Sequence, residues 1–460
     1  MNPEIGRLLA QAAAHHQAGR FAEAEAAYRT ALGMAPKHAA IMHNLGVVMA
    51  RQGKHAAAIR WFDAAIAAEP RYASAHYNRA AAYVAVGKRS EAIAGFARAS
   101  ALEPGDYASH RALGFLLLAE GDRNRALDHF ARTYELRRGD DRGGIAARSL
   151  DHATRLKLLH DAEQFRYCAA RGHDRAHFTV LARNYQAAAA DFPNAIAKLR
   201  DADRELLGES YNTAIALADA PEIPGGALAA RPDRNELVRE FSRAGGGAVA
   251  FDDLLSPVAL ARLRRYLLES TIWHDFSHIR GFLAAYLEDG LACPLLLQIA
   301  DELRGVFPGL LGEHPLSQAW AFKALEPTGA VGAHADDGAI SINFWVTPTE
   351  ACLDPVRGGL TVCLVRPPPD WPIAGYDADR QRAVMFLEQN AQERLVVPYK
   401  ENRAVLFDSR LVHASDAPIF RQGYENHRIN ITLLFGSGSA GRRDEALAGM
   451  SAALAPPYQF

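Results

Sequence analysis

A repeat of 34 residues dominates the first third of the chain. Glycine recurs at this interval, and an alanine, an aromatic residue and a proline recur at fixed distances behind it. The repeating positions are Gly19, Gly53, Gly87 and Gly121; Ala24, Ala58, Ala92 and Ala126; Tyr28, Phe62, Phe96 and Phe130; and Pro36, Pro70 and Pro104. A period of this length is typical of helix-turn-helix units that stack into a solenoid. We expect each glycine at the turn after a first helix, where a left-handed backbone is easiest without a side chain, and each proline at the end of a second helix.

With four classes of position in register, residues 1–137 resemble the tetratricopeptide repeat family. The fourth repeat departs from the pattern because Arg138 stands where proline is due, so we expect the chain to run on into a capping helix. Such solenoids present a groove lined by the first helix of each unit. Asn44 and Asn78 lie one period apart in these helices, and an amide can hold the backbone of an extended peptide. The alternative is that asparagine is simply tolerated at an exposed position, since Ala112 takes the third place.

Length, charge and cysteine content limit the class of protein. A chain of 460 residues holds roughly two to four domains. The formal charge of −2 argues against a general nucleic-acid binder, which needs a basic excess. We expect no transmembrane helix, because no run of about 18 apolar residues occurs, and no secretory signal. The four cysteines form no CxxC pair, which indicates reduced thiols rather than a disulfide framework or a zinc site, and hence a cytoplasmic protein.

The middle of the chain, residues 138–235, carries no repeat phase. Apolar residues at helical spacing over 148–170 and 177–192 predict helices that join the solenoid to the next domain. A stretch rich in proline and glycine follows at 221–233 and predicts a linker or a wrapping loop. We interpret four histidines of this segment as surface or packing residues rather than metal ligands. They are His152, His160, His173 and His177.

Residues 236–460 change to the pattern of a β-rich domain. Short apolar or alternating runs bounded by turn residues predict strands. The runs are SQAWAFKALEP, GAISINFWVTP, GGLTVCLVRP, NRAVLFDS and RINITLLFG. Two helices precede them, the first capped by Ser256 with Pro257 at its first position. Five or more such strands favour a jelly roll, also called a double-stranded β-helix. The predicted fold class is therefore α+β and multidomain, with an N-terminal α-solenoid, a helical linker and a C-terminal jelly roll.

Three side chains of this domain form a candidate metal site. His334 and Asp336 are two residues apart, so on an extended segment they point to the same side. His413 follows a later strand, and a jelly roll can make that strand a neighbour. Two imidazoles and one carboxylate on one face of an octahedral metal leave three open positions, the arrangement of non-haem iron(II) oxygenases. The alternative is a chance His-x-Asp pair among 18 histidines.

Arg428 opens the last strand, where its guanidinium can grip a carboxylate through two hydrogen bonds. With the segments AVAFDDLLSP, LFDSRLVH and HRINITLLF in order, residues 245–436 resemble the 2-oxoglutarate- and iron(II)-dependent oxygenase superfamily, in its prolyl-4-hydroxylase-like branch. The resemblance implies that His334, Asp336 and His413 ligate iron(II). It also implies that Arg428 binds the C5 carboxylate of the 2-oxoglutarate co-substrate, with O2 as the oxidant.

Two asparagines extend this comparison. Asn430 stands where the family often has serine, and it could still donate a hydrogen bond to the co-substrate. Asn343, on the strand after the His-x-Asp motif, is a candidate for contact with the C1 carboxylate, or else a buried strand asparagine bonded to backbone. Because halogenating relatives lack the carboxylate ligand, Asp336 favours hydroxylation over halogenation.

A long insert, residues 366–399, separates two of the predicted strands. Long loops at the mouth of a barrel are often lids or substrate clamps. Trp371 and Tyr376 would then stack on the substrate, or they would instead pack the insert against the barrel.

Three functions fit this combination of regions. The first is hydroxylation of a protein or peptide side chain, because a peptide-binding solenoid tethered to an oxygenase raises the substrate concentration at the iron. Fusions of this kind in the family commonly act on prolyl, aspartyl or asparaginyl residues. The second is a small-molecule (natural-product) hydroxylase whose solenoid serves oligomerisation or partner docking. The third is a scaffold that has lost activity, against which the complete triad and Arg428 speak.

Overall fold

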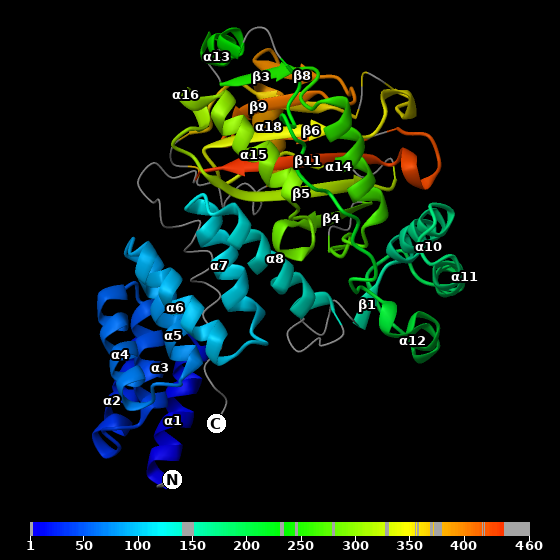
Figure 1. Ribbon diagram of the computed structural model, residues 1–460. Coiled ribbons are helices and arrows are strands. Elements are labelled where there is room, and N and C mark those ends of the chain that lie inside the picture. The colour runs from blue at the N-terminus through cyan, green and yellow to red at the C-terminus, as the bar shows by residue number, and fades with distance from the viewer. Residues whose placement is uncertain are drawn as a thin grey trace. The chain divides into compact units, whose positions relative to one another are not determined.

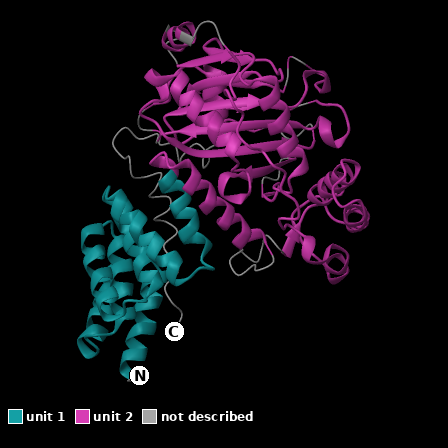
Figure 2. Cartoon of the chain, in the orientation of Figure 1, with its two compact units in different colours: residues 1–117, 440–460 teal, residues 118–439 magenta. Residues whose placement is uncertain are grey.

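The structure is a computed structural model that describes residues 3–139, 151–230, 234–243, 247–277, 281–326, 331–354, 356, 358–368, 371, 380–415, 417 and 419–436. The chain divides into two compact units, of which the second is residues 118–439, and residues 1–117 belong to the first (Figure 2). This division falls inside a helix. The boundary expected at residue 137 follows from the end of the repeat phase, and that at residue 235 follows from the change to a β-rich pattern after the linker; both remain predictions.

The first unit consists of helices that pack in consecutive pairs (Figure 1). The pairs are α1 (Pro3–Gln17) with α2 (Phe21–Met34), α3 (Ala39–Arg51) with α4 (His55–Ala68), and α5 (Ala73–Ala85) with α6 (Arg89–Leu102), and α7 (Tyr107–Ala119) follows. The turn glycines Gly19, Gly53 and Gly87 have φ angles of 72°, 72° and 74°, as expected from the repeat. A Cβ added to Gly46 would lie 2.5 Å from the ring of Phe62, so a small residue is needed where the two helices of a pair approach.

Asn44 and Asn78 are buried, which corrects the expectation that they are exposed and line a groove. Their exposed fractions are 1% and 0%. The imidazole of His43 lies between them, with Nδ1 at 3.2 Å from Asn44 Oδ1 and Nε2 at 2.8 Å from Asn78 Nδ2. Because the amide of Asn78 donates to Nε2, the neutral ring donates its Nδ1 proton to Asn44. The two asparagines therefore tie neighbouring repeats together inside the core.

Helix α8 (Arg123–Arg138) explains why arginine replaces proline in the fourth repeat. Arg138 is 3% exposed, and its guanidinium donates two hydrogen bonds to Asp289, from Nε to Oδ1 at 2.8 Å and from Nη2 to Oδ2 at 2.5 Å. Asp289 ends the short 3-10 helix η2 (Leu287–Asp289). One turn earlier, the Tyr134 hydroxyl donates to the carbonyl oxygen of Thr271 at 2.9 Å. The helix continues through residue 138 because that side chain anchors it to the rest of the second unit.

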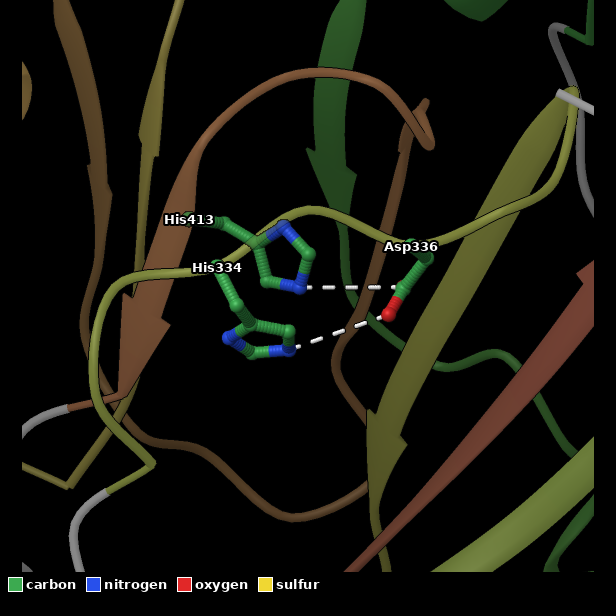
Figure 3. A group of neighbouring side chains, drawn as sticks. All are labelled: His334, Asp336 and His413. Atoms are coloured by element: carbon green, nitrogen blue, oxygen red, sulfur yellow. Dashed lines mark ion pairs between the residues drawn. The ribbon is translucent and has the colours of Figure 1, made fainter. Parts of the chain in front are cut away.

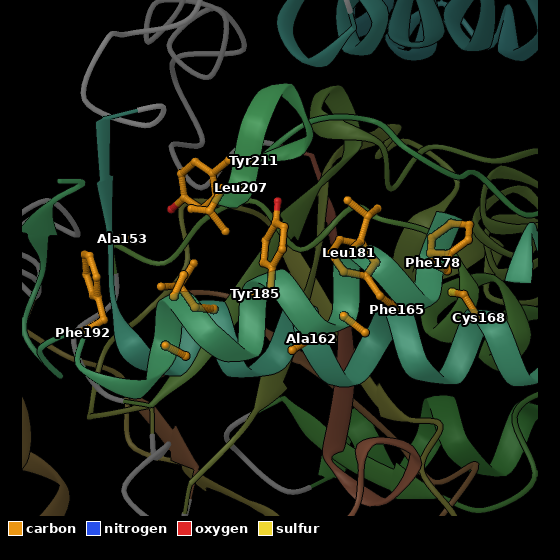
Figure 4. Packing of buried hydrophobic residues seen from close by; sticks show 14 of the residues in the cluster. Ala153, Ala162, Phe165, Cys168, Phe178, Leu181, Tyr185, Phe192, Leu207 and Tyr211 are labelled. Atoms are coloured by element: carbon orange, nitrogen blue, oxygen red, sulfur yellow. The ribbon is translucent and has the colours of Figure 1, made fainter. Parts of the chain in front are cut away.

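The connecting region builds a helical core of its own. Its elements are β1 (His152–Ala153), α10 (Arg155–Ala170), α11 (Arg175–Ala190), β2 (Ala197–Lys198), α12 (Asp201–Leu207) and the 3-10 helix η1 (Gly208–Ser210). The two short strands pair antiparallel, and α10 packs against α11. Apolar side chains of these helices, Phe165, Leu181 and Tyr185 among them, form one buried cluster (Figure 4). Helices α10 and α11 confirm the two helices expected from apolar spacing.

Two antiparallel sheets make up the C-terminal part of the second unit. Six strands lie in the order β3-β9-β6-β11-β5-β4 and three in the order β10-β7-β8. The strands are β3 (Ala248–Phe251), β4 (Phe282–Tyr286), β5 (Leu316–Ala324), β6 (Ile340–Trp345), β7 (Leu360–Cys363), β8 (Arg394–Val397), β9 (Ala404–Asp408), β10 (His413–Ser415) and β11 (Arg428–Phe435). Val362 of β7 and Phe407 of β9 belong to one buried cluster, so the two sheets pack against each other.

Several helices accompany the sheets. They are α13 (Arg234–Arg243), α14 (Pro257–Glu269), α15 (Pro294–Val306), α16 (Pro308–Leu311), α18 (Arg380–Gln389) and the 3-10 helices η3 (Thr349–Ala351) and η4 (Tyr424–Asn426). Ser256 caps α14 as expected, since its hydroxyl accepts from the Ala259 amide at 3.3 Å. Figure 1 shows α14 and α15 across the six-stranded sheet. Within the described residues, no helix is both long and apolar enough to cross a membrane.

The strand register brings distant segments of the chain together. All five strands expected from the sequence are present, as β5, β6, β7, β9 and β11. Asn430 of β11 lies opposite Trp345 of β6, and an isolated bridge joins His334 to His413. The chain thus combines a helical-repeat N-terminal region with a sheet-rich C-terminal region.

The 366–399 insert holds α18 and the strand β8. Trp371 is 5% exposed, and its ring meets that of Phe386 on α18 edge to face, with 5.8 Å between the centroids. This packing agrees with the second of the two roles expected for Trp371. Tyr376 lies outside the described residues.

Candidate metal and anion site

His334, Asp336 and His413 converge as expected (Figure 3). Each offers one ligand atom, and these atoms all lie within 4.8 Å of one another. His334 Nε2 is 3.7 Å from Asp336 Oδ1, and His413 Nε2 is 3.7 Å from Asp336 Oδ2. Backbone bonds fix the segments, because the amides of His334 and His413 each donate to the carbonyl of the other, at 3.0 and 2.8 Å. The three side chains could therefore hold one metal ion between them.

Both imidazoles are oriented through their other ring nitrogen. Nδ1 of His334 donates to the carbonyl oxygen of Gly332 at 2.8 Å, and Nδ1 of His413 donates to that of Leu411 at 3.0 Å. Carbonyl contacts of this kind fix the tautomer, so each Nε2 carries a lone pair toward the centre of the site. Burial, with a smaller effect of His334, lowers the pKa of His413 to about 4. His413 is therefore neutral near pH 7, as a metal ligand must be.

The carboxylate of Asp336 is held by Ser341, which is itself in contact with Ser409. The Ser341 hydroxyl donates to Asp336 Oδ2 at 2.9 Å and lies 2.9 Å from the hydroxyl of Ser409. The backbone amide of Asp336 donates to the carbonyl of Ser409 at 2.8 Å. Asp336 keeps only 8% of its surface exposed. These contacts leave Oδ1 on the side of His334.

Arg428 lies in the same pocket as the triad. Its surface is 2% exposed, and Nη1 donates to the carbonyl oxygen of Gly358 at 2.7 Å. Nη2 is 3.4 Å from the hydroxyl of Ser415, two residues after His413. The remaining pocket walls are mostly aromatic and apolar. They include Trp320, Phe322, Val331, Trp345 and Leu360. A buried guanidinium at this place favours an anionic ligand.

Asn343 and Asn430 also line this pocket. Asn343 Nδ2 donates to the hydroxyl of Thr432 at 2.9 Å. Within the described residues, neither Asn343 Oδ1 nor Asn430 Oδ1 has a hydrogen-bond partner, although both atoms are buried. Buried polar atoms normally have a hydrogen-bond partner, so these two amide oxygens indicate that the pocket takes a polar ligand.

All six predicted site residues are therefore brought into one pocket. The histidines of the connecting region lie elsewhere: His160 contacts Asp161 at 2.9 Å, and His173 contacts Glu269 at 3.1 Å. Ser341 and Thr432 were not among the site residues predicted from the sequence. Strand alternation carried a signal for both, because each lies two residues from a predicted site residue on the same strand.

Comparison with known proteins identifies the repeats. A tetratricopeptide repeat sequence model matches residues 9–74. The crystal structure of MamA is 22% identical in sequence over the matched region. The match covers 29% of this chain and 80% of the MamA chain, with a TM-score of 0.28. MamA 41-end from Desulfovibrio magneticus RS-1 is 26% identical in sequence. This match covers 30% of this chain and 77% of that chain, with a TM-score of 0.28. The first tetratricopeptide domain of Spaghetti (RPAP3), bound to an HSP90 peptide, is 23% identical in sequence. This match covers 26% of this chain and 96% of that chain, with a TM-score of 0.26.

No curated protein sequence matches the chain. The repeat model covers part of the first unit and none of the sheet-rich region. The N-terminal region therefore contains tetratricopeptide repeats, a class of domain that binds protein partners.

Proposed function

We propose that the chain is a 2-oxoglutarate- and iron(II)-dependent oxygenase that hydroxylates a side chain of a protein or peptide recruited by its repeats. The observation that carries the proposal is the convergence of His334, Asp336 and His413, with Arg428 buried in the same pocket. The two antiparallel sheets that pack against each other support a double-stranded β-helix as the fold around this site.

The donor set suits iron(II). Two imidazole nitrogens and one carboxylate oxygen are the protein ligands of non-haem iron oxygenases. When bound, iron(II) with 2-oxoglutarate and O2 supplies the oxidising chemistry of hydroxylation. The chain's own part is to keep both Nε2 atoms unprotonated through their Nδ1 contacts and to hold Asp336 through Ser341. The aromatic walls of the pocket exclude bulk water from the reacting groups.

The end of the pocket that holds the positively charged Arg428 suits a dicarboxylate. Arg428 would bind the C5 carboxylate, since a guanidinium can donate two hydrogen bonds to it. The oxygen and nitrogen of an asparagine amide are assigned from their hydrogen bonds, and a threonine hydroxyl both donates and accepts. With its amide turned over, Asn343 would accept from Thr432 and donate Nδ2 to the C1 carboxylate. The same rotation at Asn430 would place the donor Nδ2 where Oδ1 has no hydrogen-bond partner among the residues that the structure describes.

A small-molecule (natural-product) hydroxylase is the second candidate, with the repeats used for oligomerisation or partner docking. It is favoured by the burial of Asn44 and Asn78, because these were the residues expected to hold a peptide backbone. The aromatic walls around Trp320 and Phe322 suit an apolar small molecule as well as an apolar side chain.

Iron-dependent consumption of 2-oxoglutarate tests the oxygenase itself. The protein should form succinate only with iron(II) present, and His334→Ala, Asp336→Ala and His413→Ala should each abolish this at an unchanged melting temperature. His177→Ala, at an exposed position, is the matched control and should keep full turnover. Full turnover in any one of the three ligand variants would overturn the site.

The substrate class needs a separate experiment. The iron-loaded protein is incubated with 2-oxoglutarate and a cell lysate, and products are searched by mass spectrometry for one added oxygen atom. A modified protein supports the first candidate, and a modified metabolite without a modified protein supports the second.

A further inference from the structure

The two histidine segments of the candidate site each present small apolar residues away from the pocket. Ala333 and Ala335 flank His334, and Val412 and Ala414 flank His413. On extended chain, alternate side chains point to opposite sides. All four flanking residues belong to a single apolar cluster with part of the 366–399 insert. The side of these segments away from the pocket is therefore packed.

One face of helix α18 supplies the packing. Ala383, Phe386 and Leu387 stand three and four residues apart, which places them on the same side of the helix, and all three belong to this cluster. Ala383 is 0% exposed. The buried Trp371 contacts Phe386, and the Arg382 guanidinium carbon lies 4.4 Å from the Trp371 ring centroid. The helix is thus held over the cluster by side chains of the insert itself.

The opposite face of α18 has no such role. Val384 is 43% exposed and Met385 is 48% exposed, although both lie beside residues of the cluster. The helix therefore offers neighbouring positions that differ in whether they belong to the apolar cluster behind the histidine segments.

We propose that α18 is a positioning element for the metal ligands and that Phe386 is its principal positioning residue. The inference rests on the proposed function, because it concerns the same ligands. The contacts that orient the imidazoles come from Gly332 and Leu411, which lie in the same two segments as the histidines. A shift of either segment therefore moves a ligand and its orienting carbonyl together. A metal site needs its ligands held to within about 0.5 Å, which packing on the far side provides.

Cobalt(II) titration tests this role, because the visible spectrum of cobalt reports ligand geometry independently of turnover. The variants are Phe386→Ala, which removes the ring from the cluster, and Phe386→Leu, which keeps an apolar side chain there. Val384→Ala and Met385→Ala are the matched controls on the exposed face of the same helix. The melting temperature of each metal-free protein is measured alongside.

We expect Phe386→Ala to weaken cobalt(II) binding about 10-fold or more, as loss of outer contacts does at other metal sites, and to change the visible spectrum. Phe386→Leu should restore most of the affinity, and both controls should match the wild type. If Phe386→Ala is too unstable to purify, Leu387→Ala takes its place with the same expected result.

Two other outcomes separate the proposals. Wild-type affinity and spectrum in a folded Phe386→Ala protein with a lowered melting temperature would show that the packing serves stability alone, and would overturn this inference only. A wild-type protein that binds no cobalt(II) and shows no iron-dependent turnover would overturn the proposed function, and this inference with it.

Discussion

Arg428 is the residue on which anion binding in the candidate pocket depends. It is buried, and its Nη1 is already held by the carbonyl of Gly358. We expect Arg428→Ala to raise the Michaelis constant for 2-oxoglutarate about a hundredfold, since a charge-assisted hydrogen bond contributes roughly 3 kcal/mol. Metal affinity should change little. Arg421→Ala, at an exposed position seven residues earlier, is the control. An unchanged Michaelis constant in Arg428→Ala would remove the arginine from this role.

We expect His43 to make the repeats sensitive to acid. Burial lowers its pKa to about 4, with a smaller opposing effect of the bond to Asn44. Between pH 6.5 and 4 the unfolded chain therefore binds a proton that the folded chain excludes, so stability falls as pH falls through this range. One pH unit corresponds to about 1.4 kcal/mol, which makes the full loss about 3 kcal/mol.

Urea unfolding at several pH values measures this loss. His43→Gln should flatten the fall in stability between pH 6.5 and 4, whatever its stability at neutral pH. His38→Gln, at a partly exposed position in the turn before α3, should keep the wild-type slope. A His43→Gln protein with an unchanged slope would assign the acid sensitivity to other groups.

At the level of elements, periodicity was enough to predict local structure. The turn glycines have positive φ because the repeat needs a left-handed residue there, and strand alternation located β5, β6 and β11. The burial of Asn44 and Asn78 was not predictable, because it depends on the neighbouring repeat and on His43 as a bridge. Strand β4 also went unrecognised; it lies at the edge of its sheet beside β5, and an isolated bridge joins its Ala284 to Asp275.

For the candidate site too, spacing along the chain could be interpreted, but contacts that depend on the fold could not be predicted. His334 and Asp336 could be paired from their spacing, because two residues on extended chain share a side. Arg138 could be seen only as a departure from the repeat, since its partner Asp289 lies far along the chain. The packing of α18 behind the histidines was equally hidden, because it depends on the fold of the insert.

The ion pair between Arg138 and Asp289 fastens α8 to the rest of the second unit. Arg138, with a smaller effect of Arg137, holds the pKa of Asp289 well below its usual range against the opposing effect of burial. Arg138→Ala leaves a buried carboxylate without its main partner, so we expect a loss of about 3–5 kcal/mol in the free energy of unfolding.

A double variant separates lost packing from the unpaired charge. Arg138→Met with Asp289→Leu should be more stable than Arg138→Ala, because neither charge is then buried. Arg132→Ala, whose salt bridge to Glu135 is exposed, is the control and should lose less than about 1 kcal/mol. Equal losses in Arg138→Ala and Arg132→Ala, measured by urea unfolding, would contradict this account of α8.

For the whole molecule, the division into two compact units determines where the repeats can be removed. The repeat phase alone places the cut after residue 137, but that cut would remove Tyr134 and with it the contact to Thr271. The structure places the cut between Leu117 and Leu118, which keeps α8 with Asp289. We therefore expect residues 118–460 to fold, and residues 138–460 to be less stable in urea.

The shorter chain 118–460 separates recruitment from chemistry. Every candidate ligand lies in the second unit, so slow 2-oxoglutarate turnover without substrate should remain at the wild-type rate. Hydroxylation of a protein substrate should fall mainly through a raised Michaelis constant, because the repeats no longer concentrate that substrate near the site. Adding the separate repeats, residues 1–117, should not restore the rate, since the effect depends on a covalent tether. Unchanged kinetics on the true substrate would count against recruitment by the repeats and would favour the small-molecule hydroxylase.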